Sequence, residues 1–202
     1  MARLQDEHDT VVERFHATSG RVTGWLAIAL AAVVVLAGLA YRDEGFPAWV
    51  TGAALLGGVV AWAAMLRPAL WVTDEHLVMR NLAETVHIRL AAVEEMALRQ
   101  VLAVRADDRR WVSTVVGRPW RKALNTRRAQ VGKSETTEGM PYADYVENRI
   151  YELVHAARSA AGVRAGSPEQ LALPDAVRRE PARVPLALMA LAVLSLVVSF
   201  VA

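Results

Sequence analysis

The 202-residue chain contains no cysteine, and neither sign of charge is in clear excess, because 23 Lys and Arg oppose 21 Asp and Glu. The lack of cysteine excludes disulfides and thiolate-held metals, and it is compatible with a reducing compartment. The near balance of charge means that any local excess of one sign is informative.

Catalytic and metal-binding motifs are also missing. The sequence has no nucleophile beside a base, no glycine-rich phosphate loop and no metal-ligand spacing. The pairs Asp74-Glu75 and Asp107-Asp108 stand where turns are expected, so we interpret them as turn formers rather than acid–base pairs. We therefore predict no enzymatic activity, no cofactor, and no catalytic or metal-binding residue. The five histidines are scattered, at His8, His16, His76, His87 and His155.

Charged residues are absent from three long apolar runs, 22–40, 47–66 and 184–202. A helix of nineteen residues rises about 28 Å, close to the roughly 30 Å hydrocarbon core of a bilayer. The runs predict three transmembrane helices, the first two forming a hairpin over 22–66. A cleaved signal peptide is the alternative for the first run, but several carboxylates precede it and a second apolar run follows at once. Ala53 and Gly57, four residues apart, are expected to let the first two helices approach closely.

Arginine and lysine near the ends of these runs predict the orientation, because cytoplasmic loops hold the excess of both. The flank 1–21 contains three arginines, whereas the link between the first two runs contains only Arg42 beside two carboxylates. We expect a plasma-membrane protein with the amino terminus and residues 67–183 in the cytoplasm and the carboxyl terminus outside. Abundant Arg and Ala suggest a bacterial source. The flank is expected to be an interfacial helix or disordered, with one helical face formed by Leu4, His8, Val11, Val12 and Phe15.

Residues 67–183 form one small domain and a linker in our interpretation. Short runs rich in Val, Leu, Ile and Thr predict antiparallel strands at 70–73, 77–81 and 85–90, one or two more within 93–106, and another after a turn at 106–110. A helical repeat between Pro141 and Gly162 predicts a closing helix, with Tyr142, Val146, Ile150, Leu153 and Ala157 on one face. Residues 162–183, rich in Gly, Pro and Arg, predict the linker.

The stretches WVTDEHLVMRN, TVHIRLAAVEEM and RADDRRWVSTV resemble the bacterial PH-like domains, in particular those of actinobacterial multi-pass membrane proteins. The resemblance covers 67–161 and implies a bent seven-stranded barrel, or roll, whose open end is plugged by a carboxyl-terminal helix. This chain departs from the family pattern at LAAVEEM, where an aromatic residue commonly precedes the acidic one, and in a polar insertion from 118 to 141. The insertion leaves the position of the last strand open.

The insertion begins with GRPWRKALNTRRAQVGK, 117–133, which has six basic residues and no acidic one. Three interpretations are open: a solvated loop that follows the positive-inside bias, a contact with anionic lipid headgroups, where each charge contributes about 1 kcal/mol, and a contact with an acidic protein. Nucleic acid is not expected, because no recognition motif accompanies the charge. We also expect the turns 74–76 and 106–110 to form one binding rim with this segment. The candidate lipid- or partner-binding residues are Arg118, Trp120, Arg121, Lys122, Arg127, Arg128 and Lys133.

These features predict an integral membrane protein whose cytoplasmic PH-like domain is a non-catalytic binding or scaffolding module. The alternative function is an accessory subunit of a larger membrane transport, secretion or envelope-synthesis complex.

Overall fold

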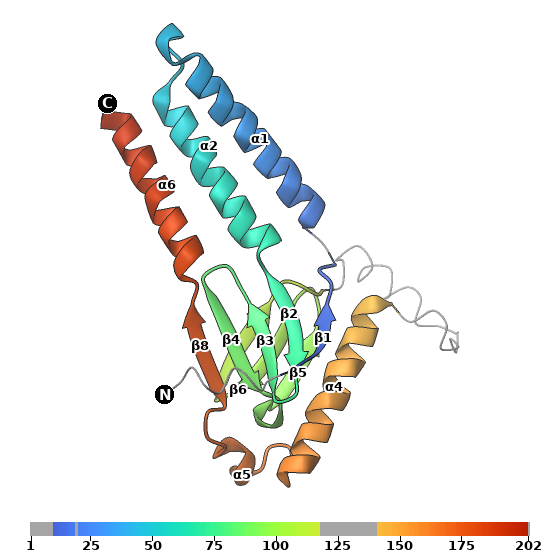
Figure 1. The fold of residues 1–202 in the computed structure, drawn as a ribbon. Coiled ribbons are helices and arrows are strands. Elements are labelled where there is room, and N and C mark those ends of the chain that lie inside the picture. Colours follow the sequence, from blue (N-terminus) through green and yellow to red (C-terminus); the bar gives the residue numbers. More distant parts are fainter. Residues whose placement is uncertain (1–9, 19, 118–140, 202) are drawn as a thin grey trace. The chain divides into compact units, whose positions relative to one another are not determined.

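A computed structural model describes residues 10–18, 20–117 and 141–201 (Figure 1). The chain divides into two compact units. One, the sheet unit, contains most of the strands and the helix that follows the basic segment. The other, the helical unit, contains three long apolar helices and the turn Asn81–Thr85.

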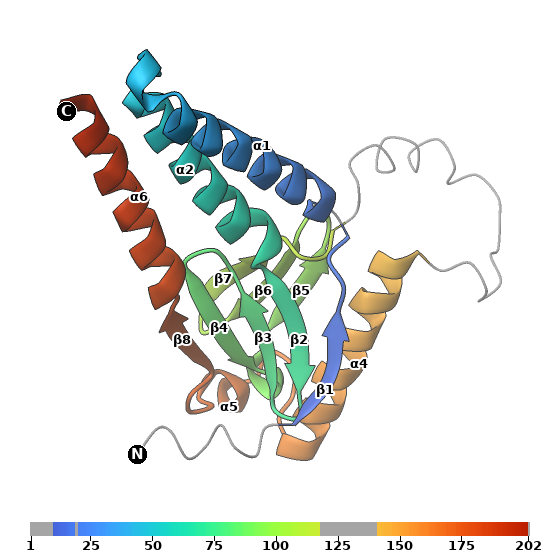
Figure 2. The same cartoon turned by 45° about the horizontal axis from the view of Figure 1, so that its top comes forward.

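The sheet unit consists of two antiparallel sheets. Five strands form the first sheet in the order β1-β2-β3-β4-β8, and β5-β6-β7 form the second (Figure 2). Their bounds are Val11–Phe15 for β1, Ala69–Thr73 for β2, His76–Arg80 for β3, Glu84–Arg89 for β4, Glu95–Leu98 for β5, Leu102–Ala106 for β6, Arg109–Ser113 for β7 and Val177–Pro181 for β8. A 3₁₀ helix, Leu90–Ala92, links β4 to the second sheet.

Alternating apolar residues explain the strands. Leu70 and Val72 of β2, Leu77 and Met79 of β3, and Val86 and Ile88 of β4 are all buried in one core, as a period of two requires. The second sheet adds Leu98, Leu102, Val104 and Trp111 to the same core. The strands expected from the local pattern between 70 and 113 are therefore present.

Helix α4, Tyr142–Ala161, packs its apolar stripe on this core and ends at Gly162, whose positive φ of 67° suits glycine. Four of the five predicted residues face the core: Val146 and Ile150 are buried, and Leu153 and Ala157 pack against the core while partly buried. Tyr142 is exposed instead, and its hydroxyl accepts a hydrogen bond from the His16 N–H at 2.7 Å.

Two of the expected boundaries are wrong. The flank 1–21 contains neither a helix nor disorder over Val11–Phe15, because these residues form β1 and pair with β2. The expected linker 162–183 contains a short helix, α5, Pro168–Leu171, and strand β8, which completes the first sheet beside β4. Both strands are formed by residues whose partners lie far away in the sequence, so no local repeat marks them.

Three helices of the helical unit are long and apolar enough to cross a membrane, as predicted. They are α1, Arg21–Ala40; α2, Ala48–Ala61, extended by a π-helical turn at Trp62–Leu66; and α6, Arg183–Val201. Helix α2 packs against both α1 and α6.

Glycines set the close approach of these helices. A Cβ at Gly38 would lie 1.9 Å from Thr51 Oγ1, and one at Gly52 would lie 2.9 Å from the Leu196 Cα. A Cβ at Gly57 would meet nothing within 4 Å. The expected pairing through Gly57 is therefore wrong, because this residue lies on a face of α2 that neither neighbour covers.

The turn between β3 and β4 belongs to the helical unit. Arg67, at the end of α2, donates hydrogen bonds to the carbonyl oxygens of Asn81 and Leu82. Ala182, at the start of α6, donates its N–H to the Ala83 carbonyl at 2.8 Å. The turn thus joins the ends of α2 and α6.

Candidate functional site

The candidate binding residues Arg118, Trp120, Arg121, Lys122, Arg127, Arg128 and Lys133 lie outside the residues that the structure describes. The two ends of that segment are described. Gly117 donates its N–H to Thr18 Oγ1 at 3.2 Å, and Thr18 donates its own N–H to the Val115 carbonyl at 3.0 Å. At the other end, the Tyr142 hydroxyl binds the backbone of His16. Both ends of the basic segment are therefore fixed to residues 16–18, immediately before α1.

Gly117 is the residue that this attachment requires. A Cβ at this position would lie 1.9 Å from the Gln100 carbonyl oxygen, so the backbone approaches the β5–β6 turn too closely for any side chain.

The turn at Asp107 and Asp108 has a defined geometry. Both residues have positive φ, 56° and 52°, between the paired residues Ala106 and Arg109. Two consecutive positive φ values are the signature of a type I′ hairpin turn. The aspartates are thus turn residues, as the sequence pattern indicated.

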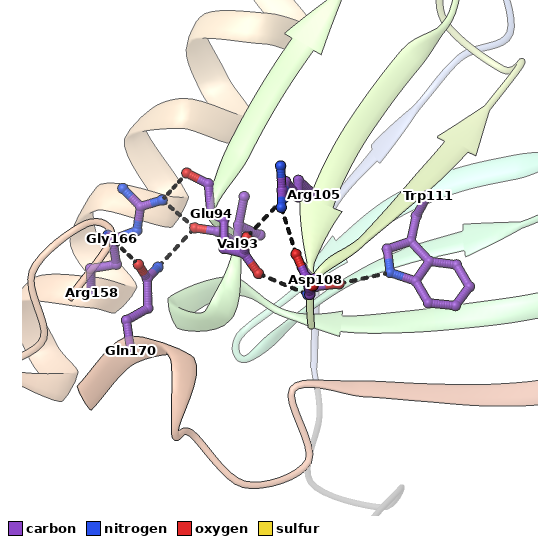
Figure 3. Close-up of polar contacts among 9 residues, drawn as sticks. Val93, Glu94, Arg105, Asp108, Trp111, Arg158, Gly166 and Gln170 are labelled. Carbon is purple, nitrogen blue, oxygen red and sulfur yellow. Dashed lines mark hydrogen bonds and ion pairs between the residues drawn. The ribbon is translucent and has the colours of Figure 1, made fainter. Parts of the chain in front are cut away.

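Asp108 also belongs to a charged cluster at this turn (Figure 3). Arg105 lies 2.5 Å from the Asp108 carboxylate and 3.1 Å from that of Glu94, while Glu94 accepts the Asp108 N–H. The hydrogen bond to Asp108, with the nearby negative charges, raises the pKa of Arg105. Because Arg105 and Asp108 are exposed, the ion pair stabilises the turn only modestly.

The basic segment of the expected common rim lies outside the described residues, so only its two turns and the ends of the segment can be placed. The Glu75 carbonyl accepts the Leu90 N–H, and Glu94, a few residues further on, holds the Asp108 backbone, so the two acidic turns share one end of the strands. The ends of the basic segment lie at the opposite end, beside residues 16–18.

The sequence pattern missed a polar cluster around the Val93 carbonyl (Figure 3). Gln170, 1% exposed, donates from Nε2 to the carbonyls of Ala91 and Val93, both at 2.9 Å, and accepts the Gly166 N–H at 2.7 Å. Arg158, at the end of α4, also donates to the Val93 and Glu94 carbonyls. Burial lowers the pKa of Arg158, since the charged form loses solvent.

This cluster fastens residues expected to be a linker to the body of the sheet unit. A short sequence pattern could have predicted the helix that carries Gln170. Ser167 precedes Pro168 and stands three residues before Gln170, which is the spacing of a capping box at a helix start. The Ser167 hydroxyl accepts the Gln170 N–H at 3.3 Å. Arg158 and Gln170 have structural roles, because both side chains bind backbone groups and so hold segments of the chain together.

No group of three or more His, Asp or Glu side chains able to hold a metal occurs within 10–18, 20–117 and 141–201.

Comparisons of the chain with family models, with curated proteins and with solved structures found no match.

Proposed function

We propose that this chain is a bacterial multi-pass plasma-membrane protein whose cytoplasmic sheet unit is a PH-like, non-catalytic binding or scaffolding module. Two antiparallel sheets around one core, closed by α4, support the PH-like interpretation. Strands β1 and β8 extend the domain beyond 67–161 on both sides.

The observation that carries the proposal is that all three helices connect to the same end of the five-stranded sheet. Phe15 pairs with Leu70, Ala69 pairs with Arg80, and Ala182 binds Ala83, so the end of β1, the start of β2 and the end of β8 lie together. We name this the connected end of the sheet.

The connections are too short to let this end move far from the helices. Three steps of the chain separate Leu66 from Ala69, and two separate Pro181 from Arg183, which allows about 11 Å and about 7 Å at full extension. Helices that span a bilayer would therefore keep the connected end near the membrane surface.

Both ends of the basic segment are fixed at the connected end, through His16 and Thr18. The described chain there also carries an excess of positive charge, Arg67, Arg80 and Arg99 against Glu84, whereas the turns at the opposite end carry Asp74, Glu75, Asp107 and Asp108 against Arg109 and Arg110. This polarity favours anionic lipid headgroups as the surface that residues 118–133 contact, with about 1 kcal/mol from each nearby charge.

The absence of cysteine makes a direct test possible. An environment-sensitive dye is attached to Ala129→Cys, and in a matched control to Arg164→Cys at the opposite end, in the full chain reconstituted in nanodiscs. Emission from position 129 should shift to shorter wavelength when about 30% anionic lipid replaces zwitterionic lipid, and about 1 M salt should reverse the shift. Position 164 should not respond.

Identical emission in both lipids would refute the lipid contact. A shift that survives replacement of Arg121, Lys122, Arg127 and Arg128 by Ala would show that the segment is not responsible. The orientation is tested separately with reporters fused after Arg42 and at the carboxyl terminus, where an inward carboxyl terminus would refute the three-span topology.

An accessory subunit of a larger membrane complex is the second candidate. It is favoured by the uncovered face of α2, where Gly57, Val60 and Ala64 are exposed at helical spacing. Small residues let another helix approach closely within a bilayer. Replacing the three helices with an unrelated anchor should abolish the activity of a subunit but preserve that of a binding module.

A further inference from the structure

Two tyrosines in the first turn of α4 expose their rings at the connected end of the sheet. Tyr142 and Tyr145 are 38% and 45% exposed, and their stacked ring centroids lie 6.3 Å apart. Helix α4 begins beside the end of β1, where Tyr142 binds His16, and runs to the opposite end, where Arg158 binds the Val93 carbonyl (Figure 1). We name these two residues the tyrosine pair.

The hydroxyl groups of the tyrosine pair are already bound to β1 and the residue after it. The Tyr142 hydroxyl accepts the His16 N–H at 2.7 Å, and the Tyr145 hydroxyl donates to Glu13 Oε1 at 2.8 Å. Arg149 Nε lies 2.9 Å from the other oxygen of Glu13, so the next turn of α4 is tied to the same strand. The rings are therefore held in place, and their apolar faces are what they offer to a partner.

The chain keeps the tyrosine pair within reach of a membrane surface. His16 precedes Arg21, the first residue of α1, by five steps, which allow about 18 Å at full extension. The interfacial layer outside the hydrocarbon core is about 5–8 Å thick on each side of a bilayer. Tyrosine concentrates in this layer because its ring is apolar and its hydroxyl is polar.

We propose that the tyrosine pair lies in the interfacial layer of the leaflet nearest the sheet unit and fixes the tilt of that unit. The inference rests on the three spans of the proposed function, but it concerns another surface than residues 118–133 and requires no anionic lipid. Because the spans already hold the chain in the bilayer, the contact costs no further translational freedom. The pair lies on the α4 side of the connected end, so the contact leans the sheet unit toward that side.

A partner protein fits the tyrosine pair less well, because the exposed area is too small. A specific protein interface buries about 800 Å² on each partner, whereas two half-exposed tyrosines of about 150–250 Å² each offer roughly 200 Å². The rest of α4 adds little apolar surface. Apart from Tyr151, its exposed positions after the first turn are polar or small: Asn148, Glu152, His155, Ala156, Ser159 and Ala160. A bilayer needs no such area, since the spans supply the attachment.

Fluorine NMR tests the proposal, because the chain has only four tyrosines. The full chain is labelled with 3-fluorotyrosine in nanodiscs of zwitterionic lipid, and single Tyr→Phe variants assign the signals. A gadolinium chelate, either attached to lipid headgroups or free in water, relaxes nearby fluorines. Tyr151 is the matched control, because it is 61% exposed on the same helix and lies nine residues, or about 13.5 Å, beyond Tyr142. Tyr41, just after α1, reports on the spans.

The headgroup chelate should relax Tyr142 and Tyr145 at least about tenfold faster than Tyr151, since the effect falls steeply over the 13.5 Å of helix. The free chelate should relax Tyr151 most. About 1 M salt should leave this pattern unchanged, because the contact is apolar. Equal relaxation of the three tyrosines by the headgroup chelate would overturn the proposal, and so would protection of the pair from both chelates, which a protein cover would produce.

The same spectra separate this proposal from the proposed function. If Tyr41 responds to the headgroup chelate and the tyrosine pair does not, this inference fails while the spans stand. If Tyr41 is silent as well, the spans are refuted, and this inference with them. The dye at position 129 reports the anionic contact of the basic segment independently.

Discussion

Replacement of Gln170 tests whether residues 162–179 are an integral part of the sheet unit. Its side chain makes three hydrogen bonds to backbone groups, at Ala91, Val93 and Gly166, and is itself 1% exposed. A linker that merely spans a distance would tolerate any polar residue at this position.

The cost of Gln170→Ala follows from these contacts. Each intramolecular hydrogen bond contributes about 1 kcal/mol net, and a buried group left without a partner costs about 1–3 kcal/mol. The Val93 carbonyl keeps Arg158 as a donor, whereas the Ala91 carbonyl and the Gly166 N–H lose the Gln170 contact. We expect a loss of about 2–4 kcal/mol, a large part of the 5–15 kcal/mol typical of a domain.

Gln170→Glu should be worse at neutral pH, because a carboxylate would face two carbonyl oxygens and could donate to neither. Acidification should restore part of the loss, since a protonated carboxyl donates one hydrogen bond. The matched control is Gln100→Ala, whose side chain is exposed in the β5–β6 turn.

Hydrogen exchange of the full chain in detergent, with urea unfolding followed by tryptophan emission, measures the effect. Amides of 91–94 and 163–172 should exchange much faster in Gln170→Ala than in the wild type or in Gln100→Ala. If Gln170→Ala lies within about 0.5 kcal/mol of the control, the docking of this segment does not stabilise the domain and our interpretation of the cluster is wrong.

Three further predictions concern other contacts. Gly38→Val should disrupt the packing of α1 on α2, because its Cβ would overlap Thr51, whereas Gly57→Ala should be neutral; disulfide crosslinking between engineered cysteines on α1 and α2 measures both, and equal efficiencies would contradict the packing. Asp107→Asn should stabilise the type I′ turn modestly, since Asn suits positive φ better and the Arg105–Asp108 ion pair is kept; a lower urea midpoint would be contrary evidence. The hydrogen bond to Glu13 raises the pKa of Tyr145 above its usual 10, so this contact stabilises the fold below pH 10 and is lost as pH rises through the raised value. Tyrosinate absorbance should show one late-titrating tyrosine that Tyr145→Phe removes.

The strands from β2 to β7 and helix α4 could be predicted because their signals are local. Alternating residues such as Leu70 and Val72, or a stripe such as Val146 and Ile150, are visible within a few positions. Strands β1 and β8 could not, because VVERF and VRREP acquire strand geometry only by pairing with residues 69–73 and 84–89. Their short sequences are compatible with coil, helix or strand until the partner is known.

The two groups of basic residues also differ in whether the sequence alone reveals them. The run 118–133 is conspicuous in the sequence because its charges are adjacent, and its binding role remains a prediction. By alternation, four arginines lie on the side of the five-stranded sheet away from the core, and no pattern in the sequence marks them as a group, since Arg14, Arg80, Arg89 and Arg178 belong to four strands spread over most of the chain. Only the sheet order brings them to one surface.

Membrane topology explains why arginines are frequent near the spans, but it does not explain which face of the sheet their side chains occupy. The positive-inside bias acts within about 15–20 residues of a span, and Arg14, Arg80 and Arg178 fall in that window, whereas residues 118–133 are about fifty residues from the nearest apolar run. The bias does not distinguish the two faces of a strand. By alternation Arg14, Arg80, Arg89 and Arg178 lie on the side of the five-stranded sheet away from the core, whereas Arg179 lies over the Trp111 ring. A requirement for charge in one compartment would be met equally by arginines on either face, so the bias predicts how many arginines lie near a span but not which face of the sheet they occupy.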